Sequence, residues 1–217
     1  AMSPETMKAY DELQKLIKEI NDPELAKALE ELRNSMEKMS PDQMRKALEN
    51  YEFNEGQYQE RLNRTIQLFK QLKLNSDIEK MATSMEELAE QEKQISESEQ
   101  SPEQDFEQQN AIRKDLKNLQ NEVDSLNQNA PEKSQKQIQQ LQQDSEQQMK
   151  QIQKELQKNI EQLKKQQGSP QANPATKKQQ RNIQQQMQKF AKQMRSAKQQ
   201  QNQQRMQINI AALQYVM

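Results

Sequence analysis

The sequence contains no histidine, no cysteine and no tryptophan, and only two of its 217 residues are glycine. Without histidine and cysteine the chain has no disulfide, none of the commonest metal ligands, and none of the side chains that most often transfer protons near neutral pH. Two isolated glycines do not build a phosphate-cradling loop or a dinucleotide-binding loop. We therefore expect no catalytic residue, no cofactor and no metal site, and we expect that the protein is not an enzyme.

Long hydrophobic runs and aromatic side chains are also scarce. Hydrophobic residues make up 31% of the chain and aromatic residues 4%, whereas charged residues make up 30% and nearly cancel, to a net charge of −1. The longest apolar run, Ile210 to Leu213, is far too short to cross a membrane. The apolar residues recur at helical spacings, which indicates long helices with narrow apolar faces rather than one large globular core.

Prolines mark the expected helix starts. Four segments share a small polar residue, then proline, then an acid: Ser3-Pro4-Glu5, Asp22-Pro23-Glu24, Ser40-Pro41-Asp42 and Ser101-Pro102-Glu103. The polar residue caps free backbone N–H groups, proline needs no hydrogen bond in the first turn, and the acid meets the positive end of the helix dipole. Segments Ala130-Pro131-Glu132 and Asn173-Pro174 are weaker versions of the same signal.

These signals predict an all-α fold with six to eight helices and no β-sheet: an elongated helical bundle with a long antiparallel coiled-coil hairpin. We expect two regions, an acidic multi-helix region over residues 1–100 and a long helical hairpin or three-helix coiled-coil region over residues 101–217. A break in the apolar pattern, beside Gly56, predicts a helix boundary near Asn54. Glutamine fills 29 of the 87 positions from residue 131 onward and favours solvated helix faces there.

The hairpin is expected to turn at Gly168–Pro174. Aligning the apolar stripes on its two arms pairs Ile160 with Ile183 and Ser145 with Ala197, and the same register gives the further pairs Leu156 with Met187, Ile152 with Phe190 and Met149 with Met194. The preceding helix, around Leu116 and Leu119, should turn back near Pro131 and pack beside the base of the hairpin. The expected result is a three-helix body with a two-helix projection.

Charge is distributed unevenly along the chain. Residues 1–130 carry 17 Lys/Arg and 28 Asp/Glu, a net charge of −11, whereas residues 131–217 carry 15 and 5, a net charge of +10. Such asymmetry indicates head-to-tail contacts or an anionic partner for the basic half. The hairpin tip gathers five cations that are candidates for contacting an anion: Lys164, Lys165, Lys177, Lys178 and Arg181. They serve either solubility or contact with an anionic surface.

A second charged cluster lies in the acidic half. Its members are Glu86, Glu87, Glu90, Glu92, Glu97, Glu99, Glu103, Asp105 and Glu107. Paired carboxylates serve glycoside hydrolysis or calcium binding in some proteins, but calcium-loop spacing is missing and Phe106 is the only aromatic residue within the cluster. We interpret the cluster as a solvated acidic helix face.

Three stretches carry a resemblance to a known family. They are the segment Arg61 to Lys70, the Glu- and Gln-rich helix Ile78 to Ile95, and the final run Ile208-Asn209-Ile210-Ala211-Ala212-Leu213-Gln214-Tyr215-Val216-Met217. The chain resembles the extracytoplasmic glutamine-rich coiled-coil region of a Bacteroidetes-type family of large membrane-anchored proteins of unknown function. The resemblance implies a periplasmic location and a membrane-anchored parent, and it brings no site residues.

The expected function is that of a non-enzymatic structural or protein-interaction scaffold, as a soluble fragment of a larger membrane-anchored bacterial protein. The alternative is a peripheral binder of anionic surfaces, acting through the basic tip on lipid headgroups or nucleic acid. Among partners we expect a protein, with an anionic membrane surface second and nucleic acid disfavoured, because only Phe190 and Tyr215 are aromatic in the basic half. A cytoplasmic location, the oligomeric state and the partner's identity stay open.

Overall fold

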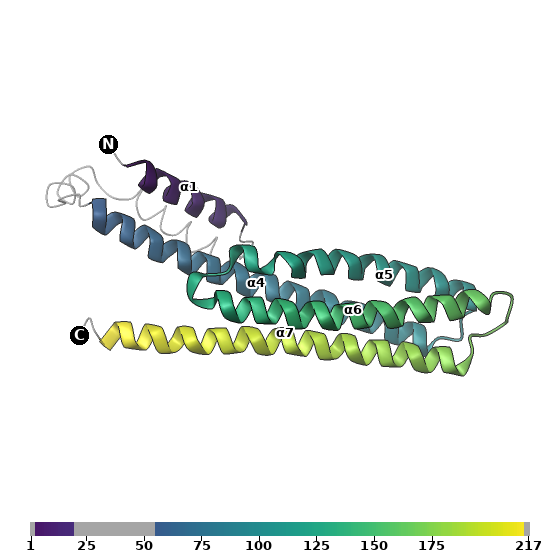
Figure 1. Cartoon of the computed structure of the whole chain (residues 1–217). Coiled ribbons are helices and arrows are strands. Elements are labelled where there is room, and N and C mark those ends of the chain that lie inside the picture. Colours follow the sequence, from purple (N-terminus) through teal and green to yellow (C-terminus); the bar gives the residue numbers. More distant parts are fainter. Residues whose placement is uncertain (1–2, 20–54, 215–217) are drawn as a thin grey trace, which may run out of the picture. The chain divides into compact units, whose positions relative to one another are not determined.

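The computed structural model describes residues 3–19 and 55–214, with side chains as far as Gln200. Five α-helices and two short 3-10 helices make up almost all of the described residues, which contain no strand, so the all-α fold class is confirmed (Figure 1). The α-helices are α1 Pro4–Glu19, α4 Glu55–Glu97, α5 Pro102–Ser125, α6 Gln135–Lys165 and α7 Pro174–Gln214. The 3-10 helices η1 Leu126–Asn129 and η2 Glu132–Ser134 lie between α5 and α6.

The helix starts follow the proline signals wherever the structure describes them. Helix α5 begins with a full capping box, because the Ser101 hydroxyl accepts from the Gln104 N–H and the Gln104 side chain accepts from the Ser101 N–H. At the start of α7, the Asn173 side chain accepts from the Ala175 N–H at 2.8 Å. The expected starts at Asp22 and Ser40 lie outside the described residues.

The connection between α6 and α7 contains the glycine that the sequence singled out as a turn. Gly168 has a φ of +86°, in the left-handed region that L-residues with a side chain rarely adopt. The Gln166 side chain closes the turn, since it accepts from the Asn173 N–H and donates to the Thr176 hydroxyl, both at 2.8 Å. The chain therefore reverses direction where the sequence predicted.

The chain divides into two compact units, Ala1–Ser76 and Asp77–Met217. The division falls inside α4 and not near residue 100, so residues 77–97 of α4 belong with the second unit. In the first unit, α1 packs on the first part of α4 through Leu16, Leu62, Ile66 and Phe69. Ion pairs Lys70–Glu12 and Lys73–Glu19 flank this small core.

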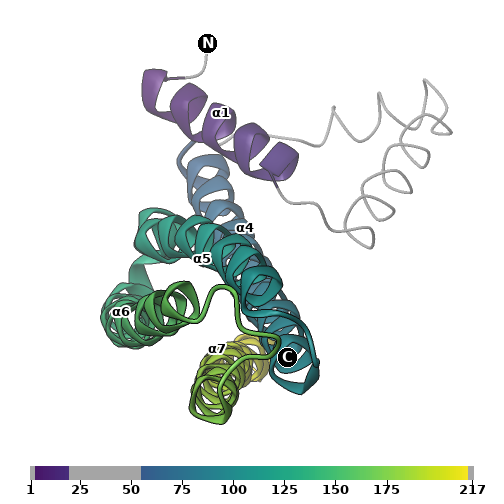
Figure 2. The same cartoon turned by 90° about the vertical axis from the view of Figure 1, so that its right-hand side faces the viewer.

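The second unit is a bundle of four helices: residues 77–97 of α4, then α5, α6 and α7 (Figure 2). Short connections make each helix run opposite to the one before it, as in an up-and-down bundle. The core is closed by apolar side chains from all four helices; the largest that are fully buried include Ile78, Met85, Ile112, Leu116, Ile138, Met149, Ile152, Leu156, Leu163, Ile183 and Phe190. Burying one such side chain stabilises the fold by about 1.5–3 kcal/mol.

This bundle corrects the expected three-helix body with a two-helix projection. The second part of α4 lies along α7, where Arg195 pairs with Glu79 and Glu86, and Lys198 also pairs with Glu79. Helices α6 and α7 are thus two members of a bundle, and a long antiparallel coiled-coil hairpin standing as a separate element is not confirmed.

Several side-chain contacts join α6 to α7, among them the hydrogen bond between Gln148 and Gln193. The Ser145 hydroxyl lies 3.5 Å from the sulfur of Met194, whereas the expected partner was Ala197, about one helical turn farther along α7. Near the turn, the Asn159 side chain donates to the Thr176 carbonyl oxygen at 3.0 Å. A side chain in an antiparallel helix pair contacts residues up to a turn away on the partner helix, so the five expected residue pairs stay a prediction.

Cross-linking tests this register. The side chains of Gln148 on α6 and Gln193 on α7 are hydrogen-bonded to each other and partly exposed. In a chain without natural cysteine, the double variant Gln148→Cys/Gln193→Cys should form an intramolecular cross-link with a short bis-maleimide, measured by mass spectrometry. The control Gln148→Cys/Gln186→Cys moves the second thiol two turns along the same face of α7 and should cross-link far less. Cross-links found only between chains would contradict the bundle.

Candidate functional site: the polar end of the second unit

Four chain segments meet at one end of the second unit, which we call the turn end: the end of α4, the start of α5, the end of α6 and the start of α7. The contacts establish this meeting. The Gly168 N–H in the α6–α7 turn donates to the Glu103 carboxylate in the first turn of α5, at 2.5 Å. The turn end therefore contains the five cations that the sequence proposed as anion contacts, together with residues 97–105.

Four of the five candidate cations are exposed, as expected for a tip: Lys164, Lys165, Lys178 and Arg181. The fifth, Lys177, is not available to a partner. Its side chain is 12% exposed, and its ammonium lies 2.6 Å from Asp105 Oδ2 and 2.6 Å from the Ile95 carbonyl oxygen. Lys177 is an internal structural cation, so its assignment as an anion contact was wrong.

The turn end also carries acids that sequence reasoning did not bring there. Glu97 is exposed at the end of α4, Glu99 is exposed on the α4–α5 connection, and Glu103 lies against the α6–α7 turn. The hydrogen bond from the Gly168 N–H lowers the pKa of Glu103, so this carboxyl stays ionised. The expected purely cationic tip is therefore of mixed charge. No acid follows Glu161 in the sequence, but the fold brings these three from more than fifty residues earlier.

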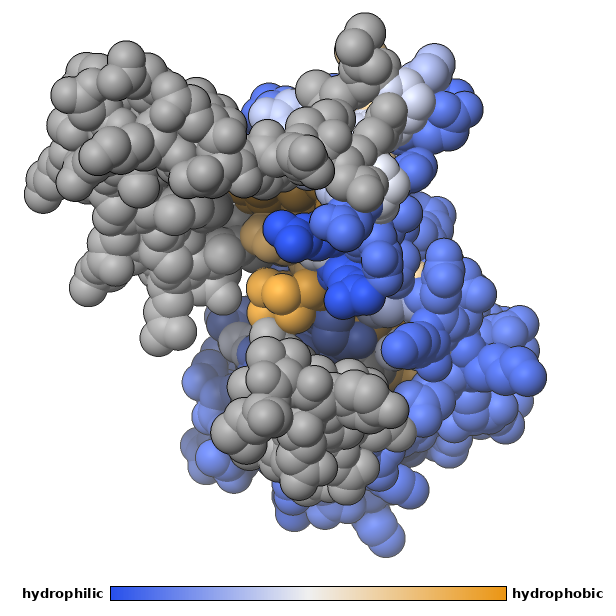
Figure 3. Space-filling model, turned by 90° about the vertical axis from the view of Figure 1, so that its left-hand side faces the viewer, coloured by the Kyte–Doolittle hydropathy of each residue, from blue (hydrophilic) through white to orange (hydrophobic). Residues whose placement is uncertain are grey.

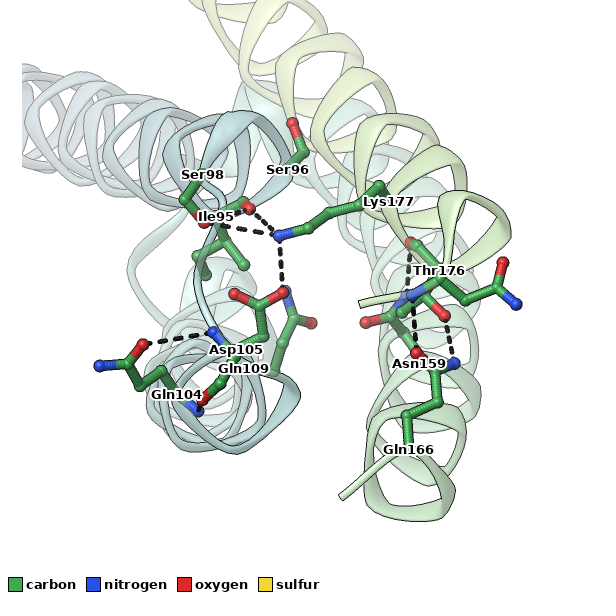
Figure 4. Close-up of polar contacts among 12 residues, drawn as sticks. Ile95, Ser96, Ser98, Gln104, Asp105, Gln109, Asn159, Gln166, Thr176 and Lys177 are labelled. Atoms are coloured by element: carbon green, nitrogen blue, oxygen red, sulfur yellow. Dashed lines mark hydrogen bonds and ion pairs between the residues drawn. The ribbon is translucent and has the colours of Figure 1, made fainter. Parts of the chain in front are cut away.

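Lys177 ties three helices together at the turn end (Figure 4). Besides Asp105 and the Ile95 carbonyl oxygen, its ammonium lies 3.4 Å from the Ser98 hydroxyl. The Ile95 carbonyl belongs to the last turn of α4, where carbonyl groups lack intrahelical partners and a cation is favoured by the helix dipole. Asp105 is fully buried on α5. One side chain of α7 thus holds the end of α4 and the start of α5.

A polar layer crosses the core one helical turn farther in. We use this name for Glu92, Gln109, Asn159 and Gln180, which come one from each helix and are all fully buried. Gln109 donates to Glu92 Oε2 at 2.6 Å. Gln180 and Gln109 each lie one turn inward along their helices from residues that bind at the turn end, Thr176 and Asp105. On α6 the layer contains Asn159, whose side-chain amide donates to the Thr176 carbonyl oxygen.

The acidic cluster is consequently not the uniform solvated face that the sequence predicted, because Glu92 and Asp105 are both buried. Burial is the main cause that raises the pKa of Glu92, to about 8. The nearby carboxylate of Asp105 raises the pKa further, while the Gln109 hydrogen bond and the Lys177 charge lower it. Glu92 is therefore protonated and neutral at pH 7.

The polar layer is incompletely hydrogen-bonded. Buried atoms without a partner among the described residues include both amide atoms of Gln180, and Glu92 Oε1, Asp105 Oδ1, Gln109 Oε1 and Asn159 Oδ1. Each buried polar atom left without a partner costs about 1–3 kcal/mol. The turn end is thus the energetically weak end of an otherwise apolar core.

The chemistry available in the described part of the chain is limited. Within it, no group of three or more acids is placed to hold a metal ion. A pocket of about 270 Å³ between α4 and α5 is lined by Gln91, Gln94, Ile95, Gln100, Gln108, Ala111 and Ile112. None of these side chains titrates or acts as a nucleophile, so the pocket offers hydrogen bonds and apolar contact only.

Comparison with known proteins yields no relative: no family model, no curated protein and no solved structure matches the chain. The resemblance to membrane-anchored coiled-coil proteins is therefore untested and stays a prediction. Among the described residues, none of the helices combines the length and the apolar character that crossing a bilayer requires.

A signal for the buried polar residues is present in the heptad pattern. Glu92 occupies the stripe position between Leu88 and Ile95, and on α5 the stripe that includes Ile112 continues backward through Gln109 to Asp105. Phe106 is only half-buried, while its neighbour Asp105 is buried. Polar residues at heptad positions therefore indicate the buried polar groups of this unit.

Removing the Lys177 charge should strongly destabilise the second unit. In Lys177→Met the buried Asp105 carboxylate loses its ion-pair partner, and we expect a loss of about 3–5 kcal/mol in the free energy of unfolding by urea. The exposed neighbour gives a matched control, since Lys178→Met should change stability by less than about 0.5 kcal/mol. The double variant Lys177→Met/Asp105→Leu should regain much of the loss. Equal stability of the Lys177→Met and Lys178→Met variants would refute the buried pair.

Proposed function

We propose that this chain is a non-enzymatic structural or protein-interaction scaffold that presents the outer faces of its bundle to a protein partner. One observation supports it most directly. Exposed glutamines occupy every fourth position along α6, at Gln139, Gln143, Gln147 and Gln151, and we call them the glutamine row. Four residues advance a helix by a little more than one turn, so successive members are neighbours on the surface and the row winds about a third of the way around α6 over about 18 Å.

The glutamine row suits a protein partner because of its chemistry. Each amide offers two donors and an acceptor and carries no charge, so the row provides repeated hydrogen bonds with a smaller desolvation cost than charged groups require. Polar residues also cover most of the coloured surface on the face shown in Figure 3. A partner held through such amides would stay bound at high salt.

The rival proposal, electrostatic binding to an anionic surface, has less support. Of the five cations proposed for it, Lys177 is engaged internally, and Glu97, Glu99 and Glu103 lie at the same end as the other four. Part of the charge asymmetry along the chain is also used within the second unit, where basic α7 meets acidic α4 through Arg195 and Lys198. The asymmetry therefore requires no external anion to account for it.

An extracytoplasmic location and a membrane-anchored parent belong to the same proposal. They depend on the family resemblance alone, and they determine which extract is searched first. The experiment below therefore begins with a bacterial envelope extract.

Substitutions in the glutamine row test the scaffold. Immobilised wild type and Gln139→Glu/Gln143→Glu/Gln147→Glu/Gln151→Glu should both fold, because glutamate and glutamine have similar helix propensity and these positions are exposed. We expect the wild type to retain one partner at about 0.1 M salt and also at about 1 M salt, where charges are strongly screened. The variant should lose this partner. A matched control places the same change at exposed positions of α7, Gln185→Glu/Gln188→Glu, and should keep the partner.

A vesicle experiment separates the two proposals. Sedimentation with anionic vesicles compares the wild type with Lys164→Gln/Lys165→Gln/Lys178→Gln/Arg181→Gln, at low and high salt. The scaffold predicts that neither protein sediments. Salt-sensitive binding by the wild type that the variant loses would favour the peripheral binder instead.

A further inference from the structure

The turn end contains two buried carboxyl groups and one buried ammonium group. Lys177 has three N–H donors, and they face Asp105 Oδ2 at 2.6 Å, the Ile95 carbonyl oxygen at 2.6 Å and the Ser98 hydroxyl at 3.4 Å. Its hydrogen bonds are therefore fully used without Glu92. Two buried negative charges beside one committed cation are unfavourable, so one of the two carboxyl groups must stay neutral.

The surroundings of Glu92 select it as the neutral one. It receives a single hydrogen bond, from the Gln109 amide to Oε2, and its Oε1 is buried without a partner among the described residues. The charged groups that act on it are Asp105 from α5 and Lys177 from α7. The polar-layer residue of α6 is Asn159, whose uncharged amide donates to the Thr176 carbonyl oxygen. Ionised carboxylates in proteins are usually stabilised by several donors or a direct cation, and Glu92 has neither.

Ionisation of Glu92 would require water to enter the layer, because no protein donor is at hand. The polar layer offers little resistance to the entry of water. The buried side-chain amide of Gln180 and the Asn159 Oδ1 atom have no hydrogen-bond partner among the described residues. Glu92 lies five residues before the end of α4 at Glu97, which is exposed, and the connection to α5 follows. Movement of this turn outward would hydrate Glu92 while the apolar layers farther along the core stay closed.

We propose that the polar layer is a proton-dependent latch: the turn end is closed while Glu92 is neutral and is loosened when Glu92 ionises. This inference stands apart from the scaffold proposal, because it concerns only contacts inside the second unit. A scaffold without a partner at the glutamine row would still contain the latch, and a failed latch would leave the row intact.

Linkage gives the direction of the pH effect. The unfolded chain releases the Glu92 proton near pH 4.5, whereas the folded chain holds it to about pH 8. Between these values unfolding releases a proton, so the unfolding equilibrium constant should rise by up to about tenfold per pH unit, and stability should be flat above this window. Glu92→Gln keeps this side chain neutral at every pH. The pH dependence of stability that Glu92 causes should therefore be absent from the variant.

The titration of Glu92 is the first test. Carboxyl-carbon NMR of protein labelled in glutamate should show one resonance with a midpoint near pH 8, absent in Glu92→Gln and present in the control Glu87→Gln, which changes an exposed acid of the same helix. Asp105→Asn should move this midpoint to lower pH, because it removes a neighbouring negative charge and frees Lys177. A wild-type midpoint for Glu92 near pH 4.5 would overturn the proposal, as would an Asp105→Asn midpoint that does not fall.

Hydrogen exchange tests the loosening itself. Between pH 6 and pH 9, the protection of amides in residues 89–97, corrected for intrinsic exchange rates, should fall at least tenfold in the wild type. In Glu92→Gln it should change by less than about twofold, and amides of α5 and α6 near Leu116 and Ile138 should stay better protected than residues 89–97 in both proteins. Equal loss of protection in the wild type and Glu92→Gln would show that the layer is not a latch.

Discussion

Each helix of the second unit has one narrow apolar face, and burying these faces is the constraint on which the rest of the unit depends. A pair of helices covers only a thin seam, but α4 and α7 bury wider faces. On α4, Ala82 and Ala89 are buried beside Met81 and Leu88, and on α7 Ala191 is buried beside Phe190. A face of this width contacts two neighbouring helices at once. A closed arrangement of four helices satisfies that requirement for α4, α5, α6 and α7 together.

The ion pairs of the second unit lie in two different environments. Toward α7, Arg195 bridges Glu79 and Glu86, and Lys198 adds a second contact to Glu79. The bonds from Lys198 and Arg195 lower the pKa of Glu79. Arg195, Glu79 and Glu86 are more than a third exposed and Lys198 is 30% exposed, so solvent screens these pairs and their contribution is modest. At the turn end, in contrast, Lys177 and Asp105 are withdrawn from water, and there the loss of either partner is costly.

The polar layer and the apolar core therefore have opposite roles. Apolar layers such as Leu116 and Met149 give most of the stability, because they are fully buried and leave no polar atom without a partner. The layer of Glu92, Gln109, Asn159 and Gln180 reduces stability and concentrates the unmet hydrogen-bonding capacity at one end. Buried polar groups in helical bundles also restrict which helix registers are acceptable, since a shifted helix would place an amide among apolar side chains. The same residues thus restrict the register and make the turn end responsive to protonation.

The sequence by itself determined the helices. Local signals were sufficient for this, because capping at Ser101, the proline starts and the left-handed turn at Gly168 act within a few residues of each other. Only the tertiary structure decided the rest: the fourth helix of the bundle, the contact of Ser145 with Met194, and the neutralisation of Lys177 by Asp105. These features depend on residues that lie 49 to 119 positions apart along the chain, so no local pattern encodes them. The charge state of Glu92 is of the same kind, because it follows from burial and from neighbours that only the packing of four helices supplies.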